Sequence, residues 1–170
     1  MATSYGREGF TLRADQIQSI RDKAIEALKN AIIAKGKRPE DYDFVNILPK
    51  DDLGLTNDEF KHTFTAAYTD EEYVNRTLGD DEFITIYGYT NTNSSPVTLK
   101  LKFYNGVSLK KIVHVQASYA QQEPYVFFEP EVWAEGEVMK IEVYGNATSD
   151  DYPILLGIVA KPKGSRLSSQ

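Results

Sequence analysis

Strict alternation of apolar and polar side chains marks the stretch Val97-Thr98-Leu99-Lys100-Leu101-Lys102-Phe103-Tyr104, and Asn105-Gly106 follows it directly. Such alternation is typical of a strand that has one face in a core. Asn-Gly next to a strand pattern is the strongest short-range signal for a hairpin. We therefore predict an antiparallel hairpin that turns at Asn105-Gly106. Its core face is expected to carry Val97, Leu99, Leu101 and Phe103.

Further strand patterns lie on both sides of this hairpin. After the turn, Val113, Val115 and Ala117 alternate with Ile112, His114 and Gln116. Other segments rich in β-branched and aromatic residues are 83–90, 125–128, 139–143 and 154–160. Glu129-Pro130 is expected to end the second of these, and the last is typical of a strand buried on both faces. Roughly six to eight strands without helical crossovers predict a mainly β protein, an antiparallel β-sandwich of jelly-roll or Greek-key type.

One amphipathic helix is predicted ahead of the strands, over residues 13–35. Its apolar residues recur at steps of three and four, so they share one face of a helix: Ile17, Ile20, Ala24, Leu28 and Ile32. Thr11 or Asp15 is a suitable N-cap, and Gly36 stands where a left-handed C-terminal cap is expected. Two arrangements are open: the helix packs on its own sheet, or it docks on a neighbouring subunit.

The length of 170 residues suits one domain with its own core. Within it we distinguish an N-terminal arm with the helix (1–38), an acidic loop-rich segment with short strands (39–82), the sandwich core (83–162) and a polar tail (163–170). The absence of cysteine excludes disulfides, thiolate metal sites and a cysteine nucleophile. No apolar run resembles a signal peptide or spans a membrane, so we expect synthesis in the cytoplasm.

Charge is unevenly distributed along the chain, whose net charge is −6. Residues 1–38 hold eight Lys/Arg and four Asp/Glu, whereas residues 39–82 hold three and thirteen. Either these charges are simply solvated, or they form complementary surfaces that meet between subunits. On the second interpretation, the candidate assembly residues are Arg7, Arg13, Asp51, Asp52, Asp80 and Asp81. The acidic balance argues against nucleic acid as a partner.

Sequence motifs that carry known chemistry are missing. The chain has no GxSxG, Walker, HExxH or GxGxxG motif. His62 and His114 are its two histidines, and neither has a metal-ligand spacing. A glycosidase pair would have to come from Glu129, Glu131, Glu135 and Glu137, and calcium ligands from the Asp pairs in turns; both alternatives are weaker than solvated surface carboxylates. We expect no enzymatic activity, no catalytic residues, no cofactor and no metal.

Exposed aromatic side chains offer an alternative function in sugar binding. The candidates for a ligand-facing platform are Tyr87, Tyr89, Tyr104 and Trp133. Core packing and cross-strand pairing explain most such residues equally well. Three Asn-x-Ser/Thr sequons, at Asn75, Asn93 and Asn146, lie in predicted loops and matter only if the chain meets a glycosylation system.

The segments 122–130 (Gln-Glu-Pro-Tyr-Val-Phe-Phe-Glu-Pro) and 140–145 (Lys-Ile-Glu-Val-Tyr-Gly) prompt a family comparison. They resemble late jelly-roll strands of small capsid and decoration proteins of phages and archaeal viruses. The resemblance covers residues 83–162, is one of pattern, and carries over no functional residue. The acidic segment 39–82 departs from a minimal jelly roll.

This resemblance implies a structural subunit of a virus-like particle that acts through subunit contacts. Its expected partners are copies of itself and other shell subunits, and its expected location is the virion. The alternative is a carbohydrate-binding or adhesive β-sandwich with a glycan as partner.

Overall fold

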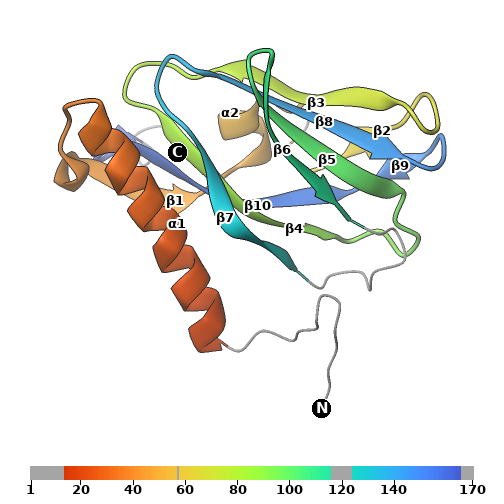
Figure 1. Ribbon diagram of the computed structural model, residues 1–170, viewed down its shortest axis with the longest axis horizontal. Helices are drawn as coiled ribbons and strands as arrows, with labels where there is room; N and C mark the ends of the chain where they lie inside the picture. Colours follow the sequence, from red (N-terminus) through yellow and green to blue (C-terminus); the bar gives the residue numbers. More distant parts are fainter. Residues whose placement is uncertain (1–13, 57, 116–123, 166–170) are drawn as a thin grey trace.

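Two four-stranded antiparallel sheets face each other in the computed structural model, which describes residues 14–56, 58–115 and 124–165 (Figure 1). One sheet has the order β1-β10-β4-β7 and the other β3-β8-β5-β6, while β2 and β9 form a small pair at one end. The elements in chain order are α1 (Ala14–Ala34), η1 (Pro39–Asp41), β1 (Tyr42–Asn46), α2 (Pro49–Leu53), β2 (His62–Thr63), β3 (Asp70–Thr77), β4 (Phe83–Asn91), β5 (Thr98–Asn105), β6 (Ser108–His114), β7 (Tyr125–Trp133), β8 (Val138–Gly145), β9 (Asp150–Asp151) and β10 (Pro153–Pro162).

The strand pairings are nested around a single turn. β5 pairs with β6, β4 with β7, β3 with β8 and β1 with β10, and every pair is antiparallel. The chain is therefore one long double ribbon folded over into two sheets, which is the jelly-roll arrangement. The predicted mainly β sandwich with one N-terminal helix is confirmed, and the topology selects the jelly roll.

The central turn lies where the sequence predicts it. Asn105 pairs with Ser108, so Gly106 and Val107 are the two central residues, and Gly106 has φ of +64°. A positive φ at the first central position is the pattern of a type II′ turn, which requires glycine there. Leu101 and Phe103 are completely buried. The alternation fails only at Leu99, which is half-buried because a bulge interrupts the pairing between Thr98 and Lys100.

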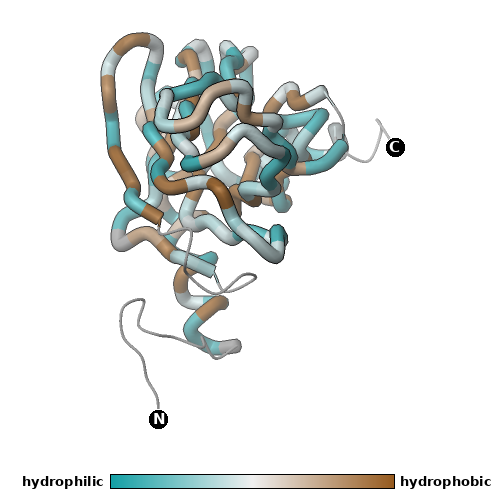
Figure 2. The backbone as a smooth tube through the Cα atoms, turned by 90° about the vertical axis from the view of Figure 1, so that its right-hand side faces the viewer, coloured by the Kyte–Doolittle hydropathy of each residue, from teal (hydrophilic) through white to brown (hydrophobic). Residues whose placement is uncertain are grey.

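Helix α1 packs on the outer face of its own sheet. Ala24, Leu28 and Ile32 are completely buried in a cluster with Phe83 and Ile158. The prediction for the helix core is therefore confirmed over its C-terminal two thirds. It is wrong for Ile17, which is 45% exposed, because the N-terminal end of α1 projects past the rest of the molecule (Figures 1 and 2).

Coverage by α1 explains why the central strands are apolar on both sides. In β4 the residues from Phe83 to Ile86 are all buried, with Ile84 and Ile86 facing the other sheet. In β10 the run from Ile158 to Ala160 is buried throughout, as the sequence predicts for this strand. Trp133 lies at the centre of the inter-sheet core and donates its Nε1–H to the Tyr104 carbonyl at 2.9 Å.

Two strand assignments differ from the prediction. β7 does not end at Glu129-Pro130 but continues to Trp133, because a register shift opposite Ile86 and Gly88 accommodates the proline. β3 was not expected at all: its Asp70-Glu71-Glu72 start lacks a strand pattern, and the expected strand over 62–68 is reduced to the two residues of β2.

Candidate functional site

One end of the sandwich is organised around a buried carboxylate. Asp151 is completely buried, and its Oδ2 accepts hydrogen bonds from the Val97 and Thr98 amides at 3.1 and 2.8 Å and from Thr98 Oγ1 at 2.6 Å. The side-chain amides of Asn91 and Asn93 donate to the same carboxylate at 3.0 and 2.9 Å. Every donor is neutral, so this carboxylate ties the β4–β5 loop to β9. It is a structural anchor with its accepting positions filled.

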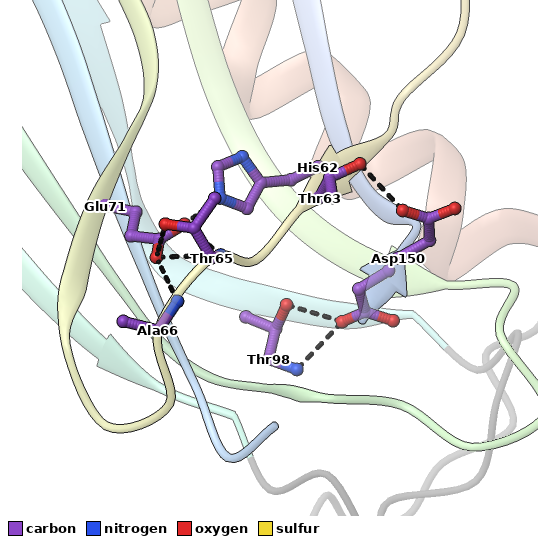
Figure 3. Close-up of polar contacts among 8 residues, drawn as sticks. His62, Thr63, Thr65, Ala66, Glu71, Thr98 and Asp150 are labelled. Atoms are coloured by element: carbon purple, nitrogen blue, oxygen red, sulfur yellow. Dashed lines mark hydrogen bonds and ion pairs between the residues drawn. The ribbon is translucent and has the colours of Figure 1, made fainter. Parts of the chain in front are cut away.

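Beside this anchor, Glu71 holds the loop between β2 and β3 (Figure 3). Its carboxylate contacts His62 Nε2 at 2.8 Å and accepts bonds from the Thr65 and Ala66 amides at 3.0 and 2.9 Å. Burial raises the pKa of Glu71, but these hydrogen bonds outweigh it and hold the pKa below its ordinary value. We call this group the Glu71 clasp.

The imidazole of His62 is fixed from several directions. Its ring packs edge-on against Phe64 and Tyr73, at centroid distances of 4.6 and 5.7 Å. A polar hollow of about 340 Å³ adjoins it, lined by Glu59, Lys61 and Glu72 among others. Within the ranges that the structure describes, no group of three potential metal ligands comes together. The arrangement positions a loop and offers polar side chains to solvent.

A second ionic cluster closes the opposite end. Lys37, just after α1, lies 2.7 Å from Asp81 and 2.6 Å from Glu135, and the Tyr42 hydroxyl donates to Asp81 at 2.7 Å. These bonds raise the pKa of Lys37, while burial and the bond to Asp81 raise the pKa of Tyr42 to about 12. Asp81 adopts φ of +62°, which the cluster stabilises. The cluster fastens α1 to the turns before β4 and β8.

The predicted assembly residues do not gather into one surface. Arg7 and Arg13 lie outside the described residues, and Asp51 and Asp80 are exposed. Asp81 belongs to the internal cluster with Lys37. Asp52 does not fit the prediction: it is completely buried, accepts the Leu48 amide at 2.6 Å and lies 3.2 Å from Lys161. Its side chain cannot reach a neighbouring subunit.

The four aromatic candidates do not form a platform. Tyr89 and Trp133 are buried in the inter-sheet core, and Tyr87 lies under α1. Tyr104 lies on the outer face of the second sheet, where the Lys140 ammonium covers its ring at 5.4 Å. Core packing therefore accounts for these residues. Of the sequons, Asn93 is engaged with Asp151, whereas Asn75 and Asn146 are exposed.

Exposed apolar side chains gather on the hairpin at the centre of the fold. Val107 is 95% exposed, Leu109 51% and Ile112 43%. We call these three residues the hairpin patch. The sequence carries a signal for it that we did not use: Leu109 and Ile112 are apolar residues in the outward phase of β6, opposite Tyr104 and Lys102.

A second apolar surface lies at the projecting end of α1. A hollow of about 290 Å³ opens between the helix and the sheet, lined mainly by Ile17, Ile20, Tyr87, Val126 and Leu156. Among the described helices, none is long and apolar enough to cross a membrane. The apolar surfaces of the chain are therefore two local patches.

Comparison with known proteins gives little further guidance. No protein-family model matches the sequence, and no curated protein matches it. One solved structure, of Bacillus endospore appendages described as a family of disulfide-linked pili, is similar to 71% of this chain and 86% of its own, with 14% identity and a TM-score of 0.40. This similarity is too low to say anything about the function of the present chain, which has no cysteine.

Proposed function

We propose that this chain is a non-enzymatic structural subunit that acts through contacts between copies of itself. The hairpin patch carries the proposal. Three large apolar side chains stand in solvent on one rigid hairpin, although the same chain buries its other strand residues efficiently. Clustered exposed apolar side chains mark protein–protein contact sites.

The polar groups of the molecule support a structural role. The Glu71 clasp, the Asp151 anchor and the Lys37 cluster each join chain segments that are distant in sequence. Their acceptors are occupied by donors of the same chain, and none presents an unoccupied nucleophile next to a base. This arrangement favours a rigid building block over a catalyst.

The finer proposal is a coat or decoration subunit of a virus-like particle. Double-sheet jelly rolls are an architecture that viral shell proteins use. Because the fold also hosts other functions, the test must be of assembly itself. A glycan platform has no support, since the four aromatic candidates are scattered through the core and the surface.

Electron microscopy of the purified full chain at low ionic strength tests both levels. We expect regular oligomers, and the finer proposal requires closed rings or shells, or binding to preformed shells. Open filaments would contradict the virion role while leaving the structural role intact. Single particles at every concentration would contradict both.

A further inference from the structure

Four strands lie at the edges of the two sheets, and two of these edges are already covered. β3 is flanked by α2 and the preceding loop: Arg76 reaches the Asp52 carbonyl at 2.6 Å, and Glu71 binds the Thr65 and Ala66 amides. On β7, outward carbonyls accept bonds from β6 lysines, with Lys110 Nζ on Val132 at 2.8 Å and Lys111 Nζ on Glu129. Lysine ammoniums in this position prevent a further strand from pairing.

The edges of β1 and β6 have no such cover in the part of the chain that the structure describes. The ladder of β1 runs to β10 alone, and the ladder of β6 runs to β5 alone. Because the ammoniums of Lys110 and Lys111 turn toward β7, they do not shield the edge of β6. That edge instead carries Leu109 and Ile112 of the hairpin patch.

The two open edges have opposite charge. Residues 97–115, which contain β5 and β6, hold four lysines and no carboxylate. Residues 39–46, which contain β1, hold Glu40, Asp41 and Asp43 and no Lys or Arg. The two edges lie on opposite sides of the sandwich, since β1 ends one sheet beyond β10 and β6 ends the other beyond β5. They therefore cannot satisfy each other within one molecule.

We propose that strand β6 of one copy adds to strand β1 of a second copy, edge to edge, so that copies join head to tail. This inference rests on the proposed structural role and names the surface that performs it. Backbone hydrogen bonds between the two edges extend a sheet across the contact, and β1, with five residues, matches most of the seven-residue β6. Phe44 and Val45, both half-buried, lie on the acceptor strand as apolar partners for Leu109 and Ile112.

The charges give this contact its direction. Lysine-rich β6 meets carboxylate-rich β1, whereas β6 against β6 or β1 against β1 brings like charges together. Each copy carries one edge of each kind, so the contact is heterologous and repeats from copy to copy until a ring closes or a filament grows.

The test uses two full-length variants, each blocked at one edge. Leu109→Glu with Ile112→Glu places carboxylates on β6, and Glu40→Lys with Asp41→Lys places ammoniums beside β1; all four side chains are exposed. Matched controls make the same changes elsewhere: Ile33→Glu with Tyr68→Glu, and Asp22→Lys with Glu26→Lys. Thermal melts establish that every variant folds.

In native mass spectrometry we expect wild type and both controls to form oligomers, each blocked variant alone to be monomeric, and a mixture of the two to regain oligomers. Amide hydrogen exchange in β1 and β6 should slow at least tenfold on wild-type assembly. If the wild type assembles and the blocked variants assemble equally well, or exchange in β1 and β6 is unchanged, this interface is wrong while the structural role stands. If wild type is monomeric throughout, the structural role itself is wrong.

Discussion

Replacement of Asp151 tests whether the buried carboxylate anchors the loop end of the sandwich. Asp151→Ala leaves the Val97 and Thr98 amides, the Thr98 hydroxyl and two Asn side chains without their acceptor in a site that water does not reach. Removing one partner of a buried charged group costs about 3–5 kcal/mol. Asp151→Asn keeps one oxygen for the four donors at Oδ2 but directs an NH₂ group at Asn93, so we expect about 1–3 kcal/mol.

Urea unfolding followed by circular dichroism measures these differences. The matched control is Asp150→Asn, the exposed neighbour whose carboxylate meets Thr63 at 2.7 Å and Lys61 at 3.5 Å; it should cost less than about 1 kcal/mol. An Asp151→Ala variant within about 1 kcal/mol of wild type, or one no less stable than the Asp150 control, would refute the anchoring role.

The remaining predictions concern the helix, the clasp and the central turn. Leu28→Ala should lower the free energy of unfolding by about 2–5 kcal/mol, whereas Ile17→Ala should change it by less than about 1 kcal/mol; equal effects in urea titrations would contradict the helix packing. The pKa of Glu71 is depressed in the folded chain, so its stabilisation is present above the unfolded pKa of about 4.5 and is lost as pH falls through the folded value. Glu71→Gln should therefore flatten the fall of unfolding free energy below about pH 4.5, and an unchanged acid limb would contradict the clasp. Gly106→Ala should cost about 1 kcal/mol, because alanine at φ of +64° is strained; a melting temperature at or above that of wild type would refute the turn assignment.

The sequence predicted those elements whose local pattern and tertiary environment agree. Val97 to Phe103 alternate because one face of β5 is in the core, and Gly106 is required by the turn, so both signals were correct. Leu99 was wrong because alternation does not reveal a bulge. Ile17 and Leu28 have the same helical phase, and only the extent of the sheet beneath α1 decides that one is exposed and the other buried.

Side chains with identical chemistry took opposite roles for reasons of topology. Asp51 and Asp52 are adjacent carboxylates in α2, yet one is exposed and the other completely buried beside Lys161. Composition gives no signal for that difference. The acidic start of β3 concealed a strand, because Glu71 is held by the His62 loop and does not follow the alternation of a half-buried strand. The hairpin patch was visible in the sequence as Ile112 in an outward position.

Sedimentation velocity of the full chain over a range of concentrations, at low and at high ionic strength, tests the central claim most directly. At low salt we expect species at multiples of the 19.2 kDa chain mass whose share grows with concentration. Their share should fall at 1 M salt, because the Debye length shrinks from about 10 Å at 0.1 M to about 3 Å and the charge attraction between the β6 and β1 edges is screened. A single species of 19.2 kDa at every concentration and low salt would contradict the account.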